Sequence, residues 1–533
     1  MPPLLGALMY AGGRPFVLLL LFSASVLLGF RGADASVHDY GGRRFTVKGN
    51  AFILHGGSEG LYASIPSPNS SAPASGNSFI RFEKIIFRRS KEAAEKAKNA
   101  VTRTTSTVKA IIFEVEDRNN IGGSAYGGQR AICCTADLAK LGACTEGTII
   151  YRHSEHNPDW PQALSATFVG ADLEATLSSK TIQITRTGMY NVYFIYCDPA
   201  LDGLEIEGKT IWKNPTGYLP GTMGPLMKFY GFMSLAFLLL GIYWFSQYAR
   251  FWTEVMPLQN CITLVIALGM IEMTLWYFEY VEFNNTGIRP KEITFWAVTF
   301  GAVKKTVSRM LILIVSMGFG VVRPTLGGLT SKVTFLGGTF FLASEILELV
   351  ENMGTISDVS GKPRLFLALP VAILDAFFIV WIFTSLSRTL KKLQAKRMTG
   401  KLDIYRKFTN ALVVTVIVSV GWIGFELYFK ATDAYGEHWQ SAWMIPALWQ
   451  VLSFSVLCVI CALWAPSQNS MRFAYSDDGS EDFDQEDDRY LIKPGPYSYK
   501  DSWSFSVSSD VKKTAIEETA VSKDEEDEDE KRE

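Results

Sequence analysis

The chain has 533 residues, 48% of them hydrophobic, and its 51 basic and 53 acidic residues leave a formal charge of only −2. That balance hides a segregation of charge: residues 224–464 are strongly apolar, whereas residues 465–533 hold 20 acidic against 9 basic residues. This pattern excludes a single soluble domain and gives no basic surface for nucleic acid, and it is typical of a membrane protein with an acidic tail.

Residues 1–35 are predicted to be a secretory signal peptide. Arg14 precedes the apolar run PFVLLLLFSASVLLGF, and Ala33-Asp34-Ala35 forms a small-x-small cleavage site before Ser36. An uncleaved membrane anchor is the alternative, but the apolar run is short for a span. We therefore expect the following segment to lie in an oxidising lumen or outside the cell.

Residues 36–223 are predicted to form a luminal all-β sandwich. Eight short runs of alternating or β-branched residues are separated by Gly, Asn and Asp breaks. The runs are RFTVKGNAFIL, SFIRFEKIIF, STVKAIIFEVE, GTIIYRH, SATFVG, KTIQITRTG, YNVYFIYC and LEIEGKTIW. A helix-like insert at 90–101 interrupts them. A flexible loop at 67–78 carries a glycosylation sequon at Asn69.

Four of the seven cysteines precede the first predicted span and are expected to form two disulfides. These four are Cys133, Cys134, Cys144 and Cys197. A bridge between the two adjacent cysteines would be strained, so two pairings remain open. One is Cys134–Cys144 with Cys133–Cys197, and the other is Cys133–Cys144 with Cys134–Cys197. Their spacing does not match a zinc site, and no metal or other cofactor is expected.

From residue 224 onward, seven apolar runs of about twenty residues predict a seven-helix transmembrane bundle. They cover 224–247, 258–280, 292–321, 332–351, 364–386, 408–429 and 441–464. With the first domain luminal, the cytosolic loops hold 11 basic residues and the luminal loops 5, in agreement with the positive-inside rule. A second sequon, at Asn284, then falls on the luminal side, so we expect both Asn69 and Asn284 to be glycosylated. The tail, residues 465–533, is expected to be cytosolic and disordered.

The third predicted span carries charges in its apolar middle, at Lys304, Lys305 and Arg309. A charge near the bilayer centre costs at least about 2.5–3.5 kcal/mol, so these residues need a partner or a polar interior. A helical rise of about 1.5 Å per residue places acidic residues of neighbouring spans near the same depth. These are Glu272, Glu345, Glu348 and Asp375. We expect the two signs to pair around a polar cavity, with Lys304 and Glu345 as the first pair to consider. A static polar clamp is the alternative.

Two segments carry a resemblance to a known family. GAVKKTVSRMLILIVSMGFGVVRPTLGG, at the third span, and APSQNSMRFAYSDDGSEDFDQEDD, after the last span, resemble matching parts of the transmembrane protein 87 family. The order of signal peptide, β-rich domain, seven spans and acidic tail is similar too. This family belongs to the lung seven-transmembrane receptor superfamily, also described as Golgi-dynamics-domain seven-transmembrane proteins.

The resemblance implies a Golgi or endosomal membrane protein that acts in retrograde transport from endosomes to the Golgi. It also implies a bundle whose cavity holds membrane lipid or lipidated cargo. A cation channel of the Golgi or plasma membrane is the alternative function.

Other functions fit the sequence less well. A G-protein-coupled receptor is disfavoured because Val322-Arg323-Pro324 stands where an acidic-Arg-Tyr switch is expected. An enzyme is not expected, since GGLTSK at 327–332 lacks P-loop spacing and the two histidines of RHSEH lack the spacing of a metal site.

The tail offers one motif for a partner. Asp487 lies four residues before the pair Leu491-Ile492, a pattern that sorting adaptors recognise. Adaptor proteins in the cytosol are therefore the expected partners of the tail.

Overall fold

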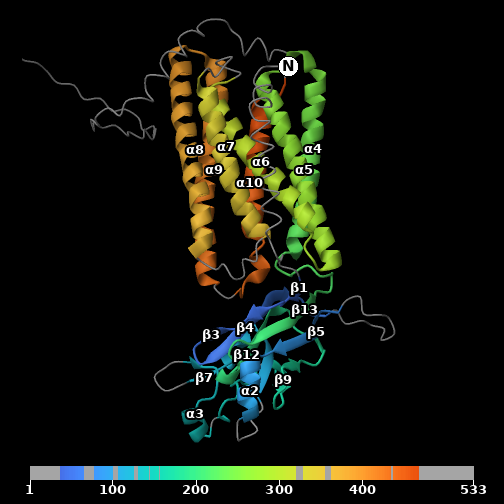
Figure 1. Cartoon of the computed structure of the whole chain (residues 1–533). Coiled ribbons are helices and arrows are strands. Elements are labelled where there is room, and N and C mark those ends of the chain that lie inside the picture. Colours follow the sequence, from blue (N-terminus) through green and yellow to red (C-terminus); the bar gives the residue numbers. More distant parts are fainter. Residues whose placement is uncertain are drawn as a thin grey trace, which may run out of the picture. The chain divides into compact units, whose positions relative to one another are not determined.

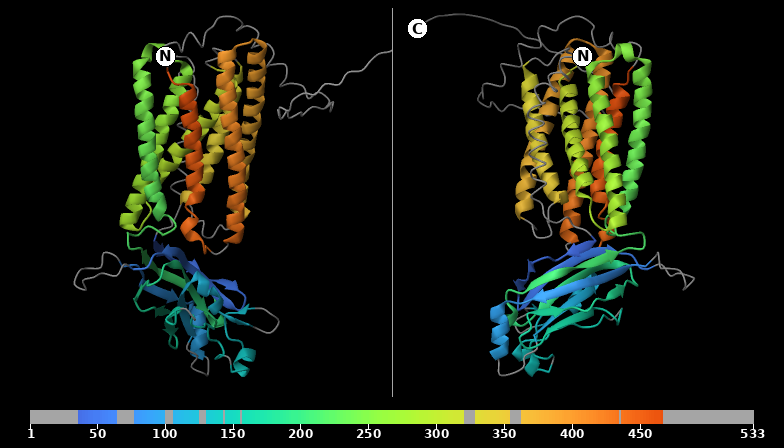
Figure 2. Two further views of the ribbon diagram at one scale, coloured as in Figure 1. Left: turned by 180° about the vertical axis from the view of Figure 1, so that it is seen from behind. Right: turned by 45° about the vertical axis from the view of Figure 1, so that its right-hand side comes forward.

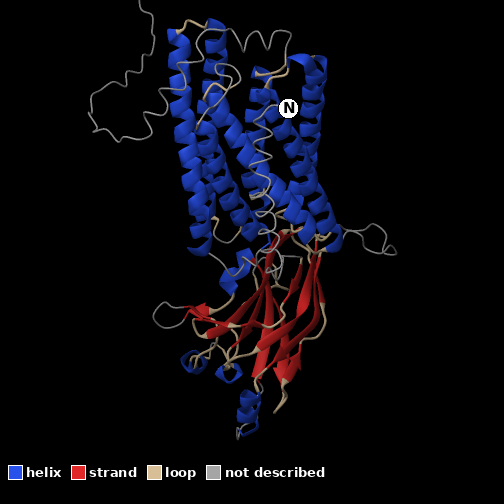
Figure 3. Ribbon diagram, turned by 45° about the horizontal axis from the view of Figure 1, so that its top comes forward, coloured by secondary structure: helices blue, strands red, loops and turns tan. Residues whose placement is uncertain are grey.

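The computed structural model describes residues 36–64, 77–99, 106–124, 130–142, 144–154, 157–319, 328–353, 362–433 and 436–466. Strands occupy the first part of this range and long helices the second (Figures 1 and 3). The predicted signal peptide, the sequon at Asn69, the sorting motif and nearly all of the acidic tail lie outside the described residues.

The first part, called the β-domain below (residues 36–223), contains two sheets that face each other. One sheet has the order β1 (Val37–Asp39), β13 (Glu205–Lys213), β5 (Phe79–Arg88) and β10 (Glu174–Thr176), with β2 (Arg43–Arg44) on β13 and β11 (Thr181–Gln183) on β5. The other has the order β3 (Thr46–Lys48), β4 (Ala51–Leu61), β12 (Gly188–Tyr196), β6 (Ser106–Glu114) and β9 (Gln162–Phe168). Neighbouring strands within these two sheets pair in antiparallel fashion.

The core of the β-domain lies between the sheets. Buried side chains alternate along the strands, as the period-2 pattern predicts. Phe87 and Trp212 come from one sheet and Val192 and Phe194 from the other, and all four are fully buried in one cluster. The expectation of an all-β sandwich is thus confirmed.

One predicted strand differs in the structure. GTIIYRH does not join either sheet, and its residues Ile149 and Tyr151 make only isolated bridges, to Cys133 and Ile121. The segment belongs to an excursion between β6 and β9, which also holds β7 (Gly123–Ser124), β8 (Arg130–Ala131) and α3 (Ala136–Lys140). The helix-like insert forms α2 (Lys91–Asn99).

The disulfides select one of the two open pairings. Cys133 bonds to Cys197, with Cα atoms 5.7 Å apart, and Cys134 bonds to Cys144, with Cα atoms 6.0 Å apart. Cys197 directly follows β12, so the first bond attaches the excursion to a central strand. A small apolar cluster that includes Ile149 and Ile195 packs around it.

Seven long helices follow in the described residues after 223. They are α4 (Gly224–Arg250), α5 (Pro257–Thr286), α6 (Lys291–Ser316), α7 (Leu329–Met353), α8 (Lys362–Ala395), α9 (Thr399–Thr432) and α10 (Met444–Leu463). Six of them are long and apolar enough to cross a membrane; α6 is the exception among the seven because three cations lie in its middle. Pro257 begins α5, and Gly287, with φ of 74°, ends it in the left-handed conformation that favours glycine.

The helices differ in how deeply they are enclosed. In the most apolar stretch of each helix, 44% of the residues of α5 are buried by the rest of the chain, against 6% of those of α9. The exposed apolar side chains of α9 include Val414, Ile417 and Val420. These surfaces suit contact with lipid, whereas α6 packs against α5, α7 and α8. Figure 2 shows the bundle from two further sides.

Polar and aromatic contacts connect the β-domain to the helices. Asn284, in the last turn of α5, donates a hydrogen bond to the carbonyl of Thr216 and accepts one from the amide of Leu219. Trp439, just before α10, packs against Tyr62 with ring centroids 5.2 Å apart. A Cβ atom at Gly60 would lie 2.4 Å from the Trp439 ring, so only glycine allows this approach.

Candidate functional site

The charges predicted in the membrane form a layer of ion pairs around α6. Lys304 contacts Glu272 of α5, with 2.5 Å between Nζ and Oε2, and the two side chains are 3% and 1% exposed. Gln450 of α10 accepts a hydrogen bond from Lys304 at 3.2 Å and donates one to Glu272 at 3.5 Å. The ammonium also lies 5.6 Å from the ring centroid of Phe237 of α4. This one cation therefore contacts three neighbouring helices.

The other two cations of α6 reach different neighbours. Lys305 contacts Glu348 of α7 at 2.5 Å, and Arg309 makes two hydrogen bonds to Asp375 of α8, at 2.5 and 3.1 Å. Each residue of a helix turns by about 100°, so adjacent lysines point to different helices while residues four apart share a face. Lys304 therefore binds a different helix from Lys305, whereas Lys305 and Arg309 share a face and reach α7 and α8 from successive turns.

Glycine at position 301 lets two carboxylates approach α6. A Cβ atom there would lie 3.1 Å from Oε1 of Glu272 and 3.7 Å from Oε2 of Glu348. The face of α6 that carries Gly301 lies against these two acids, and Lys304 and Lys305, three and four residues further along α6, pair with them. Close packing of this kind is typical of helix contacts in membranes.

Glu345 does not pair with Lys304, so that expectation is wrong. Its Oε1 accepts a hydrogen bond from the hydroxyl of Thr299 at 2.9 Å. Thr299 and Lys304 are five residues apart, which places them on different faces of α6. Residue spacing in the sequence indicates only an approximate depth for these residues, and depth does not determine the direction in which a side chain points.

A fourth ion pair, buried like Lys304–Glu272, was missed by the sequence analysis. Arg289, before α6, contacts Glu279 of α5 at 2.5 Å, and both side chains are buried. The hydroxyl of Thr294 also donates to Glu279, and Arg289 donates to the carbonyl of Asn352 at the end of α7. An acid at position 279 inside an apolar run was the available signal. The pair lies at the helix ends near the β-domain.

Buried ion pairs make the bundle sensitive to loss of one charge. Removing one partner of such a pair typically costs about 3–5 kcal/mol, because the other charge stays buried without compensation. The layer joins α5, α6, α7, α8 and α10 through side chains that apolar packing alone would not position. It has the features of a clamp, and a hydrated cavity around it stays a prediction.

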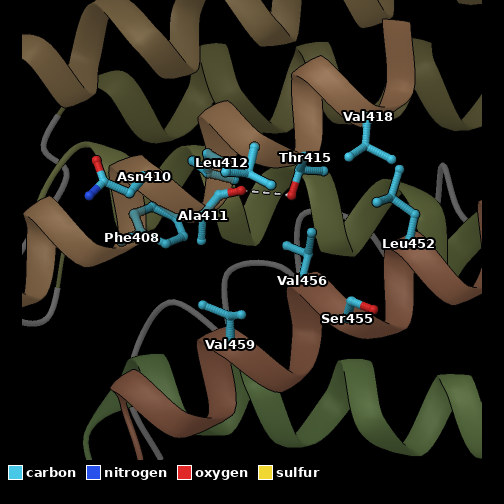
Figure 4. A pocket seen from close by; sticks show the side chains of 11 residues that line it. Phe408, Asn410, Ala411, Leu412, Thr415, Val418, Leu452, Ser455, Val456 and Val459 are labelled. Atoms are coloured by element: carbon cyan, nitrogen blue, oxygen red, sulfur yellow. Dashed lines mark hydrogen bonds between the residues drawn. The ribbon is translucent and has the colours of Figure 1, made fainter. Parts of the chain in front are cut away.

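A separate pocket of about 360 Å³ lies between α9 and α10 (Figure 4). Its walls are almost entirely apolar, with Phe408, Leu412 and Val418 on α9 and Leu452 and Val456 on α10. None of the charged residues of the ion-pair layer lines it. The hydroxyl of Thr415, also on the wall, is bonded to the carbonyl of Ala411 in its own helix, so it offers little polarity to a ligand.

The remaining sequence candidates carry no visible chemistry. His153 is exposed, and its neighbour in RHSEH lies outside the described residues. In the part of the chain that the structure describes, no group of three or more His, Cys, Asp or Glu residues is arranged to hold a metal ion. Cys261, Cys458 and Cys461 are unbonded thiols within the helices.

The helical part of the chain resembles a known protein family. A family model described as "GOST, seven transmembrane domain" matches residues 225–471. The chain is 34% identical to Transmembrane protein 87A of Xenopus tropicalis over 279 residues, or 51% of each chain. It is 33% identical to human Transmembrane protein 87B over 278 residues, or 50% of this chain and 49% of that one. It is 25% identical to Membrane protein PTM1 of Saccharomyces cerevisiae over 283 residues. The chain spans about half the length of the curated relatives it matches.

Proposed function

Because this chain belongs to the transmembrane protein 87 family of GOST seven-transmembrane proteins, we propose that it acts in membrane-protein traffic between endosomes and the Golgi. In this proposal the β-domain lies in the lumen, and the bundle binds the acyl chain of a lipid or a lipidated cargo. The observation that carries the proposal is the apolar pocket between α9 and α10.

Three features of that pocket support an acyl chain as its occupant. Its volume of about 360 Å³ lies in the range of small-molecule sites. Its lining lacks charged side chains, and a polar ligand would lose its hydration there without compensation. Val414 and Val418 on its wall are exposed, so the pocket opens toward the surface that lipid covers.

A photoreactive phospholipid tests this occupant directly. The full chain is placed in nanodiscs that contain a phosphatidylcholine with a diazirine on one acyl chain, and labelled peptides are identified after illumination. Peptides of α9 and α10 should be labelled, and Ala411→Phe, which narrows the pocket, should reduce the labelling. Val420→Phe adds a ring to an exposed position of α9 outside the pocket and serves as the matched control. Equal labelling of both variants would contradict the site.

The trafficking role needs a test in cells. In cells of its own organism that lack the gene, a cargo that returns from endosomes to the Golgi should accumulate in endosomes. The full chain should restore its return, and Ala411→Phe should not. Replacing Leu491 and Ile492 by Ala should redistribute the protein if sorting adaptors read the tail. An unchanged distribution of this variant would show that the Leu491-Ile492 motif does not act in sorting.

A cation channel is the second candidate, and one observation favours it. The pairs Lys305–Glu348 and Arg309–Asp375 are partly exposed, so the rest of the chain does not fully enclose these charges. Purified protein in planar bilayers should then conduct cations, and Asp375→Asn should change the conductance or its selectivity. A silent bilayer with folded protein present would remove this alternative.

A further inference from the structure

Glu345 differs from the other acids of the ion-pair layer. Glu272, Glu279, Glu348 and Asp375 each contact a lysine or arginine at 2.5 Å. Glu345 is only 3% exposed, and its single hydrogen bond within the described residues comes from the neutral hydroxyl of Thr299. Its second oxygen, Oε2, is buried and has no hydrogen-bond partner.

The cations that Glu345 would need are already bound to other acids. On α6, Lys304 contacts Glu272, Lys305 contacts Glu348, and Arg309 contacts Asp375. Three positive charges thus meet three negative charges in the layer without Glu345. The pair Arg289–Glu279 is likewise complete at the end of the bundle near the β-domain.

The other charged neighbours would repel an ionised Glu345. Glu348 lies one turn further along α7, and its carboxylate already accepts hydrogen bonds from Lys305 and from the hydroxyl of Ser344. Glu351 is the next acid on α7, while α5 contributes Glu272 and Glu279 and α8 contributes Asp375. An ionised Glu345 would place a second carboxylate one turn from Glu348, and this buried carboxylate would have no cation of its own.

We propose that Glu345 is a proton-binding site of the bundle: its carboxyl group holds a proton at neutral pH, and the ion-pair layer is electrically balanced in that form. The carbonyl oxygen, Oε1, keeps the hydrogen bond from Thr299, and the proton resides on Oε2. Release of the proton to solvent breaks the O–H bond and leaves one uncompensated negative charge on α7, one turn from Glu348. The inference concerns the layer itself and does not depend on the trafficking role or on the pocket between α9 and α10.

Infrared spectroscopy of the full chain in nanodiscs at pH 7 tests the proposal. The wild-type protein should show the C=O stretching band of a protonated carboxyl group, and Glu345→Gln should lack it. Glu348→Gln is the matched control on the same helix, one turn away, and should keep the band. Because Gln resembles a protonated Glu, Glu345→Gln should change the unfolding temperature by less than about 2 °C. Glu348→Gln leaves Lys305 without its partner and should lower that temperature clearly more.

Two results would overturn the proposal. One is a wild-type spectrum without any band that Glu345→Gln removes, since Glu345 would then be ionised. The other is a loss of stability in Glu345→Gln as large as in Glu348→Gln, since Glu345 would then be acting through its charge. Should Glu345→Gln not accumulate as folded protein, Thr299→Val replaces it: loss of the hydrogen bond to Oε1 should move the band to higher frequency. A band that stays in place would equally contradict the assignment.

Discussion

The side-chain oxygen of Asn284 accepts a hydrogen bond from the backbone amide of Leu219, at 3.1 Å. Its Nδ2 atom donates to the carbonyl of Thr216, also at 3.1 Å, and its own carbonyl accepts from the amide of Tyr218. One residue of the last turn of α5 therefore binds three positions of the segment that leads from the β-domain into α4. Nδ2 is also the atom to which a glycan would be attached.

We expect Asn284 to remain without a glycan once this contact has formed, although its sequon predicts one. Thr286→Ala removes the sequon but keeps the asparagine, so the electrophoretic mobility should match that of the wild type. Asn284→Ala removes the contact too and should lower the unfolding temperature more than Thr286→Ala. Asn69→Gln, in the other sequon, should give a visible shift. A shift with Thr286→Ala would show that Asn284 is modified and that the contact forms around a glycan or not at all.

The two disulfides should differ in their contribution to stability. Cys133–Cys197 spans 64 residues of sequence and Cys134–Cys144 spans 10. Loss of a native disulfide from a small secreted domain costs about 2–5 kcal/mol, and the chain-entropy model assigns more to longer loops. The pair Cys133→Ala with Cys197→Ala should therefore destabilise the β-domain more than Cys134→Ala with Cys144→Ala. Chemical denaturation of each double variant measures the difference, and the reverse order would contradict a loop-length effect.

The stability of the β-domain should fall as the pH rises above the usual titration range of a glutamate. Glu114, at the end of β6, is buried, and this burial raises the pKa of its carboxyl group above the ordinary value of 4.5, with repulsion from Glu116 adding to the effect. An acid with a raised pKa in the folded state stabilises the fold below its unfolded pKa, and that contribution is lost as the pH rises through the folded pKa. Glu114→Gln should flatten this dependence and stabilise the domain at neutral pH. Thermal unfolding from pH 4 to pH 8 measures it, and identical profiles for both proteins would contradict the assignment.

The periodic pattern of apolar residues predicted the strands and helices, but it did not predict the direction in which the charged side chains point. Alternating strands and long apolar runs gave the sandwich and the helices, because burial imposes those periods on the chain. Lys304, Lys305 and Arg309 were recognised as charges needing partners. Their actual partners depend on how each helix is rotated about its axis, and residue counting from approximate span ends gives depth alone. The pair Arg289–Glu279 was missed because Arg289 lies outside the apolar run and resembles an ordinary loop residue. The disulfide pairing stayed open because it depends on how the excursion folds back onto β12.

The final prediction concerns Lys304–Glu272, the most deeply buried of the three ion pairs that the cations of α6 form. Lys304→Met and Glu272→Gln should each destabilise the folded bundle by about 3–5 kcal/mol, because each leaves one buried charge without its partner. The double variant should recover much of that loss, and the coupling energy follows from the complete cycle. The exposed pair Lys407–Asp403 on α9 is the matched control, and it should show a coupling below about 1 kcal/mol. The free energy of unfolding of each variant is measured in detergent, with cysteine accessibility as the readout of unfolding. Lys304→Met combined with Glu345→Gln should be about as unstable as Lys304→Met alone, because Lys304 and Glu345 have different partners. Strong coupling between Lys304 and Glu345, with none between Lys304 and Glu272, would contradict the pairing seen in the structure.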